Sequence, residues 1–254
     1  MTNQKSGNNT SQLIALIGRL LDYPELEIEL YRDELMDIVT SSVLSKRNKQ
    51  EIISFIDRCS EMPLLDWQSD YDGLFERGRS LSLLIYEHIH GESRDRGQAM
   101  VDLLAQYEKA GLEIAHNELP DHLPLFLEFS STQGEQGIGW IEDIIPVLSL
   151  LAVRLEKRES GYASLMRGLL DLCGAKVNIS ELREQVKNEK EDHTPKELDK
   201  VWEEEAVTFG GDSVNGGCPT NQHRPTENQR KDQEVPVNWM SMNETASATQ
   251  TKEV

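Results

Sequence analysis

The feature that most constrains the fold of this chain is the repeated spacing of its apolar residues by three and four positions. That spacing places them on one face of an α-helix. It is clearest near the N-terminus, after a predicted N-cap at Thr10 or Ser11. The apolar face there comprises Leu13, Leu16, Ile17, Leu20 and Leu21. Strand-like alternation is not seen in residues 10–174, so the sequence predicts an all-α fold, a compact single-domain bundle of about eight to ten helices.

Proline, glycine and serine mark where further predicted helices begin and end in the rest of this region. Pro24 and Pro63 end helices, because the residue before a proline is pushed out of helical geometry. Gly111 sits where a left-handed C-terminal residue is expected. Pro146 is expected to kink the helix that contains it. The predicted helices after the first cover residues 25–41, about 50–62, 64–75, 80–91, 94–110, 138–159 and 162–173, and a further helix start follows residue 118.

Composition changes along the chain and predicts four parts. Residues 1–9 are polar and are expected to be a flexible N-terminus, and residues 10–175 form the helical domain. Residues 176–209 are highly charged and contain a short amphipathic stretch, within 196–209, that could dock on the body or on a partner. Residues 210–254 are rich in Gly, Asn, Gln, Thr and Pro, which predicts a disordered tail.

Charge and cysteine content exclude several functional classes. With 45 acidic and 26 basic residues the chain carries a net charge of −19, and such a field repels nucleic acid. Its three cysteines are far apart and form no C-x-x-C pair, which argues for a reducing compartment and against a thiolate metal site. No apolar run approaches the roughly 20 residues of a membrane helix. The N-terminus also lacks a secretory signal, so we expect a cytoplasmic protein without direct membrane insertion.

Motifs for catalysis and metal binding are missing from the sequence. There is no G-x-S-x-G, H-E-x-x-H or phosphate-loop pattern. His88 and His90 are two residues apart, so a helix would point them to different sides and they could not easily share a metal. We therefore expect no enzyme activity, no catalytic residue, no cofactor and no metal, and keep an undetected helical hydrolase only as a remote alternative.

The most distinctive segment is Glu118-Leu-Pro-Asp-His-Leu-Pro-Leu-Phe-Leu-Glu-Phe129. Pro120 is predicted to occupy the first turn of a helix, where its missing N–H costs nothing. Asp121 would then lie near the positive helix N-terminus, followed by His122. An ordinary helix start, with these side chains used for capping, is the plainer interpretation of the segment.

This segment, which reads E-x-P-D-H-L at residues 118–123, resembles the signature of the redox-enzyme maturation chaperones, which escort molybdenum enzymes during assembly. The chain is similar in particular to the nitrate reductase delta-subunit branch, the NarJ-type molybdenum cofactor assembly chaperones. The blocks that carry this resemblance are Leu20–Pro24, Tyr71–Gly97, Glu118–Phe129 and Trp202–Phe209.

The resemblance implies an all-helical, non-catalytic chaperone. It would bind the N-terminal region of the apo form of the respiratory nitrate reductase alpha (catalytic) subunit, alone or as an alpha–beta complex. Molybdenum cofactor would be inserted there before the enzyme attaches to its membrane anchor. A weak homodimer stays open, and a structural subunit of the mature reductase is the main alternative.

A client-binding surface is predicted around the signature. Its expected members are Glu118, Pro120, Asp121, His122 and Leu123, with Tyr23, Tyr71, Phe75 and a loop from Arg94 to Arg96 as weaker candidates. The acids would stand at the rim of an apolar groove and attract a basic segment. Replacing Asp121 and His122 by Ala should then weaken binding and leave the thermal midpoint nearly intact. The competing interpretations are a hydrogen-bonded His122 at a helix start, arginines that brace a turn, and a Tyr23 that belongs to the core.

Overall fold

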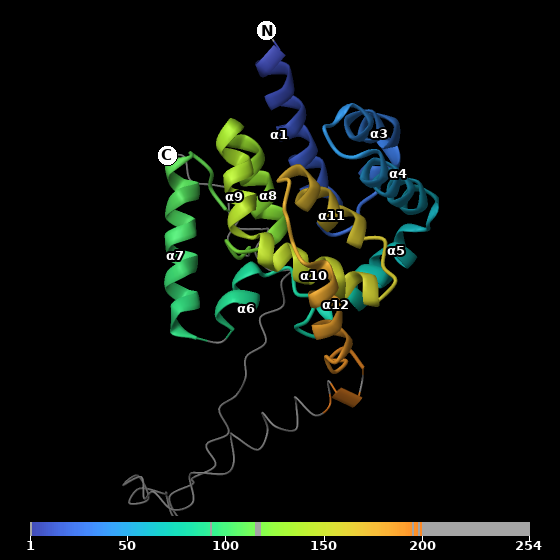
Figure 1. Ribbon diagram of the computed structural model, residues 1–254, viewed down its shortest axis with the longest axis vertical. Coiled ribbons are helices and arrows are strands. Elements are labelled where there is room, and N and C mark those ends of the chain that lie inside the picture. The colour runs from blue at the N-terminus through green and yellow to red at the C-terminus, as the bar shows by residue number, and fades with distance from the viewer. Residues whose placement is uncertain (1, 92, 115–117, 195, 198, 200–254) are drawn as a thin grey trace, which may run out of the picture. The chain divides into compact units, whose positions relative to one another are not determined.

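The computed structural model describes residues 2–91, 93–114, 118–194, 196–197 and 199 (Figure 1). Within these ranges the chain forms α-helices and short helical turns and no strand, which confirms the predicted all-α class. All described residues belong to one unit, Met1–Glu203. The predicted tail, and most of the predicted amphipathic stretch at 196–209, lie outside the described residues.

The helices have the following bounds. They are α1 (Thr2–Leu21), α2 (Glu27–Leu30), α3 (Arg32–Ser41), α4 (Lys46–Glu61), α5 (Leu64–Tyr71), the π-helical turn η1 (Asp72–Glu76), α6 (Ile85–His90), α7 (Arg94–Lys109), α8 (Leu123–Thr132), the 3-10 turn η2 (Gly134–Gln136), α9 (Gly137–Asp143), α10 (Ile145–Lys157), α11 (Ala163–Leu172) and α12 (Ile179–Lys187). The first helix extends N-terminally beyond the expected cap at Thr10 or Ser11.

The described residues contain more helices than predicted because two predicted helices are divided and because α12 lies in the charged segment before the stretch where a short helix was expected. Tyr31, with a ψ angle of 17°, separates α2 from α3 within the predicted helix 25–41. Ile144, with a ψ angle of 10°, separates α9 from α10 within 138–159. Pro146 therefore occupies the first turn of a new helix, where it loses no hydrogen bond, and the predicted kink was wrong.

The apolar face of α1 is buried as its spacing predicts. Leu13, Ile17 and Leu21 are each completely buried. The helix packs most extensively on α8 and also contacts α3 and α11 (Figure 1). Around it, α11 packs on α10 and on α4. The core thus joins elements from both ends of the described chain.

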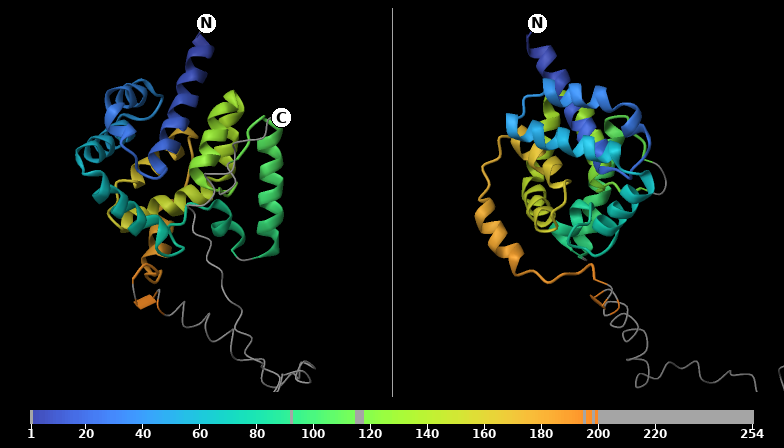
Figure 2. Two further views of the ribbon diagram at one scale, coloured as in Figure 1. Left: turned by 180° about the vertical axis from the view of Figure 1, so that it is seen from behind. Right: turned by 90° about the vertical axis from the view of Figure 1, so that its right-hand side faces the viewer.

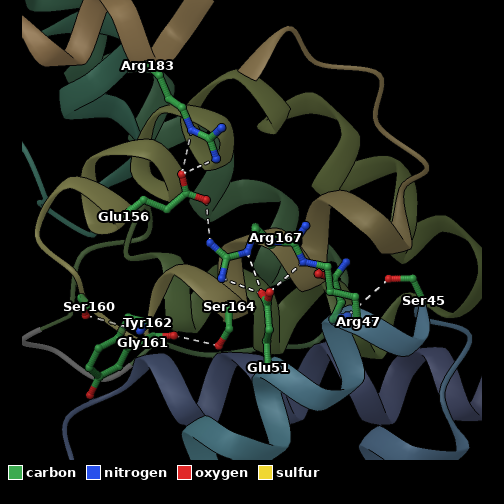
Figure 3. A network of polar contacts seen from close by, with 11 residues as sticks. Ser45, Arg47, Glu51, Glu156, Ser160, Gly161, Tyr162, Ser164, Arg167 and Arg183 are labelled. Atoms are coloured by element: carbon green, nitrogen blue, oxygen red, sulfur yellow. Dashed lines mark hydrogen bonds and ion pairs between the residues drawn. The ribbon is translucent and has the colours of Figure 1, made fainter. Parts of the chain in front are cut away.

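A polar network ties the four helices α4, α10, α11 and α12 together (Figure 3). Arg167 on α11 bonds Glu51 on α4 and Glu156 on α10, each at 2.7 Å. Arg183 on α12 bonds the other oxygen of Glu156 at 2.9 Å, and Arg47 bonds Glu51 at 2.9 Å. Because these pairs are partly or largely exposed, solvent screens them and each stabilises the fold only weakly.

The described residues include no helix that is both long enough and apolar enough to cross a membrane.

Gly18 permits the close approach of α1 to α8. A β-carbon at this position would lie 3.2 Å from the β-carbon of Leu127 and 3.2 Å from the carbonyl oxygen of Pro124. Both atoms belong to the rigid part of α8, so they have little room to move. A side chain at position 18 would push the two helices apart.

We therefore expect Gly18→Val to lower the free energy of unfolding by about 1–3 kcal/mol, the usual cost of overpacking. Gly97→Val on α7 is the matched control, because a β-carbon there meets no atom within 4 Å. Urea unfolding followed by circular dichroism measures both variants. Equal stability of the two would show that α1 and α8 are not tightly packed at Gly18.

Candidate functional site

The signature segment lies along a cleft between α1 and α8. The cleft has a volume of about 400 Å³. Its lining residues are Ala15, Gly18, Arg19, Asp22, Glu118, His122, Pro124, Leu125 and Glu128. The wall formed by α8 is apolar at Pro124 and Leu125. Asp22, Glu118 and Glu128 supply three carboxylates, and Arg19, which pairs with Asp22, supplies one guanidinium, so carboxylates are in excess. The cleft can therefore accept an apolar side chain next to positive charge.

Backbone pairing places the signature segment at this cleft. The amide of Leu123 donates to the carbonyl of Leu83 at 2.8 Å, and the amide of Ile85 donates to the carbonyl of Asp121 at 2.9 Å. These bonds hold residues 83–85 in extended form beside residues 121–123. For this reason α6 begins at Ile85, later than the predicted start at Ser80 or Ser82.

Pro120 lies in a turn before the helix, so its predicted place in the first helical turn was wrong. The proline in the first turn of α8 is Pro124. The carbonyl of Pro120 accepts a hydrogen bond from the hydroxyl of Tyr107 at 2.8 Å. Pro120 thus fastens the turn to α7.

Asp121 is completely buried and does not stand at a rim, contrary to the sequence-based expectation. Its Oδ2 accepts from the amide of Tyr86 in the first turn of α6 at 3.1 Å, so it caps α6 and not α8. Arg96 Nη2 lies 3.9 Å from the same oxygen. Burial raises the pKa of Asp121, and the Tyr86 bond and the Arg96 charge only partly oppose this.

The Asp121–Arg96 pair is incompletely hydrogen-bonded. Asp121 Oδ1 and Arg96 Nε are both buried and have no hydrogen-bond partner among the described residues. Arg96 also bonds Glu87 on α6 at 3.1 Å. These contacts support the interpretation that Arg96 braces the helices around it. Arg96 lies in the first turn of α7, and not in a loop as the sequence predicted.

His122 reaches the cleft, as does Glu118. Burial lowers the pKa of His122, although the nearby carboxylates of Asp22 and Glu118 act in the opposite direction. The imidazole is therefore neutral at pH 7 and can both donate and accept a hydrogen bond. Glu118 is exposed.

Tyr71, Phe75 and Leu123 lie in the core. Tyr71 is 3% exposed and donates to the carbonyl of Leu21 at 3.0 Å. Phe75 packs edge-on against Tyr162 at 5.0 Å between ring centroids. Leu123 is completely buried.

Tyr23 and Arg94 are exposed, but neither lines the cleft. The ring of Tyr23 packs edge-on against Tyr71 at 5.5 Å. Tyr23 is 44% exposed, so it stands at the surface above the core and not inside it.

Sequence reasoning missed several residues of the cleft. Arg19 is the main one: it pairs with Asp22 and Glu27, each at 3.2 Å, and also with Glu25. Asp22 lies in the block Leu20–Pro24, which carried the resemblance and could have indicated it. Glu128 lies on α8 inside the block Glu118–Phe129, so the same block could have indicated it.

No group of three or more His, Cys, Asp or Glu side chains that could hold a metal ion occurs in the described part of the chain.

A helical body with an apolar, acid-rimmed cleft defines a class of protein that can hold a peptide segment. Comparison with known proteins identifies the family. The family described as nitrate reductase delta subunit matches residues 44–166. The chain is 42% identical over 213 residues to the nitrate reductase molybdenum cofactor assembly chaperone NarJ of Escherichia coli K12, covering 83% of this chain and 90% of that protein.

Two further relatives agree. The probable chaperone NarW of the same strain is 42% identical over 217 residues, which cover 84% of this chain and 91% of the relative. The probable chaperone NarJ of Bacillus subtilis is 30% identical over 168 residues, which cover 64% and 90%. The chain belongs to the NarJ-type nitrate reductase molybdenum cofactor assembly chaperones, as the sequence motifs predicted.

Burial of Asp121 changes the expected effect of replacing it. Asp121→Ala removes the acceptor of the Tyr86 amide and leaves Glu87 as the one carboxylate paired with Arg96 among the described residues. We expect a loss of about 2–3 kcal/mol in the free energy of unfolding. Asp121→Asn should retain most of the stability, because its amide oxygen can still accept and no charge is buried.

Urea unfolding at pH 7 measures the free energy of unfolding of both Asp121 variants. The control is Glu118→Ala at an exposed position, which should change this free energy by no more than about 0.5 kcal/mol. If Asp121→Ala is as stable as the control, the buried carboxylate has no structural role.

Proposed function

We propose that this chain binds the N-terminal region of the apo nitrate reductase alpha subunit. In this role it keeps the subunit competent for molybdenum cofactor insertion, in the cytoplasm and before membrane attachment. The observation that carries the proposal is the cleft between α1 and α8, whose apolar wall and acidic rim suit an amphipathic, basic segment. The chain acts by binding and release and not by catalysis.

The apolar wall supplies most of the affinity in this proposal. Half-buried Leu125 and exposed Ala15 offer apolar surface beside buried Pro124. Such surface contributes about 25 cal/mol for each Å² removed from water. The carboxylates of Glu118 and Glu128 are exposed. Each carboxylate would add about 0.2–1 kcal/mol of binding free energy when paired with a basic residue of the client. The main effect of these charges would be to speed the encounter and to favour positively charged segments.

The predicted site residues divide by position. Glu118 and His122 contact the client in the cleft, where neutral His122 offers a hydrogen bond. Pro120, Asp121 and Leu123 act indirectly, because their bonds and burial position the segment.

The outlying candidates have smaller parts in this proposal. Tyr71 and Phe75 support the structure from the core. Tyr23 and Arg94 are surface residues beyond the cleft, where they would meet only a longer client segment. Arg96 serves to hold α6 against α7.

Titration calorimetry with a synthetic peptide of the alpha subunit's N-terminus tests the proposal, with a scrambled peptide for comparison. We expect saturable binding of the native sequence alone. The variant Glu118→Gln with Glu128→Gln should weaken it about three- to tenfold, since two exposed ion pairs are lost. The weakening should diminish at high salt.

The matched control replaces two exposed acids away from the cleft, Glu61→Gln with Glu108→Gln. It keeps the change in net charge and should bind as the original chain does. Equal affinities of the cleft variant and the control would remove this cleft from the interface. If the native peptide does not bind at all, capture of the full apo subunit decides between recognition of a folded surface and a wrong client.

A further inference from the structure

Residues 178–192, near the end of the described chain, cross back over helices that precede them. We call this segment the C-terminal strap. It contains α12 and ends at Asp192. Figure 2 shows this segment, in orange, running along the outside of the preceding helices. Helix α12 packs on α10.

The end of the strap is bound by the loop after η1. The carboxylate of Asp192 accepts hydrogen bonds from the amides of Arg79 and Ser80, each at 2.7 Å. It also accepts from the Ser80 hydroxyl at 2.8 Å. Burial acts to raise the pKa of Asp192, but these hydrogen bonds outweigh it and the pKa is lowered. The loop therefore binds a charged carboxylate.

Gly78 shapes this loop around the carboxylate. Its φ angle is +87°, a conformation that side chains disfavour, and it turns the following amides toward one point. A β-carbon on Gly78 would lie 2.7 Å from Asp192 Cγ and 2.8 Å from both carboxylate oxygens. The space that a side chain would fill is the space that the carboxylate occupies.

A second carboxylate of the strap is held beside the first. Arg154 on α10 bonds Glu189 through two parallel contacts of 2.8 Å, the geometry in which guanidinium groups recognise carboxylates. The same guanidinium donates to the carbonyl of Ser80 at 2.8 Å. Arg154 and the loop are thus one surface, with two acceptor positions for carboxylates three residues apart.

Little apolar burial holds the strap in place. Val186 is the one hydrophobic side chain of the described strap that is fully buried. The other attachments are polar, among them Lys157, which donates to the carbonyls of Val186 at 2.8 Å and Glu189 at 3.2 Å. A nine-residue helix is unstable alone in water, and polar contacts exchange readily with solvent. The strap therefore opens at lower free energy than the core unfolds.

We propose that the loop Gly78–Ser80 and Arg154 form a binding site for an acidic peptide with two carboxylates three residues apart, which the chain's own Glu189 and Asp192 occupy at rest. When the strap opens, the site becomes available to an acidic segment of another chain. This site is separate from the cleft between α1 and α8, since no residue lines both.

The test uses the full chain with Glu189→Gln and Asp192→Asn, which release the strap without shortening it. A labelled synthetic peptide of residues 178–194 is the probe, followed by fluorescence anisotropy. We expect saturable binding to this variant and at least tenfold weaker binding to the original chain, whose site is occupied. A peptide carrying the same two substitutions should not bind. Glu191→Gln, at an exposed neighbouring acid, should behave as the original chain does.

Hydrogen exchange shows whether the strap has been released, and a third substitution shows where the peptide binds. Amides of residues 182–192 should exchange at least tenfold faster in the double variant, with an unchanged circular dichroism midpoint for the body. Adding Gly78→Ala, which fills the cradle, should abolish peptide binding. The proposal fails if the double variant keeps its strap protected. It also fails if the strap is released and the peptide does not bind, or binds equally well with Ala at position 78.

Discussion

The packing of α1 on α8 is the constraint on which the rest of the structure depends. These helices lie more than a hundred positions apart in the sequence, and their contact brings the block Leu20–Pro24 beside the block Glu118–Phe129. The close approach at Gly18 sets the depth of the cleft between them. Because interiors are densely packed, a shift at this contact would change both the core and the cleft wall.

The signature segment combines residues with different tasks at successive positions. Asp121 is directed inward and organises α6, whereas His122 is directed to the cleft, as expected where neighbouring residues on extended backbone alternate sides. Burial of a carboxylate with one oxygen unpaired is unfavourable on its own. Its compensation comes from Tyr86 and Arg96, on two other helices, so that α6, α7 and the segment before α8 hold one another in place.

The sequence predicted the helical class and most helix positions, because the three-and-four spacing is a local property. It did not predict where α2 and α9 end. Tyr31 and Ile144 are not helix-breaking residues such as proline or glycine, and their conformations depend on packing. The sequence also grouped Glu118 with His122, and both residues line the cleft between α1 and α8. The burial of Asp121 could not be foreseen, because it depends on the pairing of residues 83–85 with 121–123, and no local pattern reports a contact of that separation.

The sequence also does not tell which of the predicted site residues are buried and which are exposed. Tyr71 and Phe75 belong to a block that resembles the family, and the resemblance alone does not distinguish a contact residue from a core residue. Their burial assigns them to the core. Arg19 was missed because no motif marks it. Its place in the cleft is seen only from its ion pairs with Asp22 and Glu27 in the folded chain.

The two proposed sites would take segments of opposite charge, and this offers a reason why the chain itself occupies one of them. A cleft rimmed by carboxylates suits a basic client segment and repels other copies of this acidic chain. An open carboxylate-binding site would instead attract acid pairs of matching spacing on a neighbouring copy, such as its own Glu189 and Asp192. A strap tethered within the same chain competes at an effective concentration on the order of millimolar, which exceeds that of other copies at ordinary concentrations. Occupation by Glu189 and Asp192 therefore keeps the site from self-association and leaves it accessible only to an acidic segment presented at comparable local concentration.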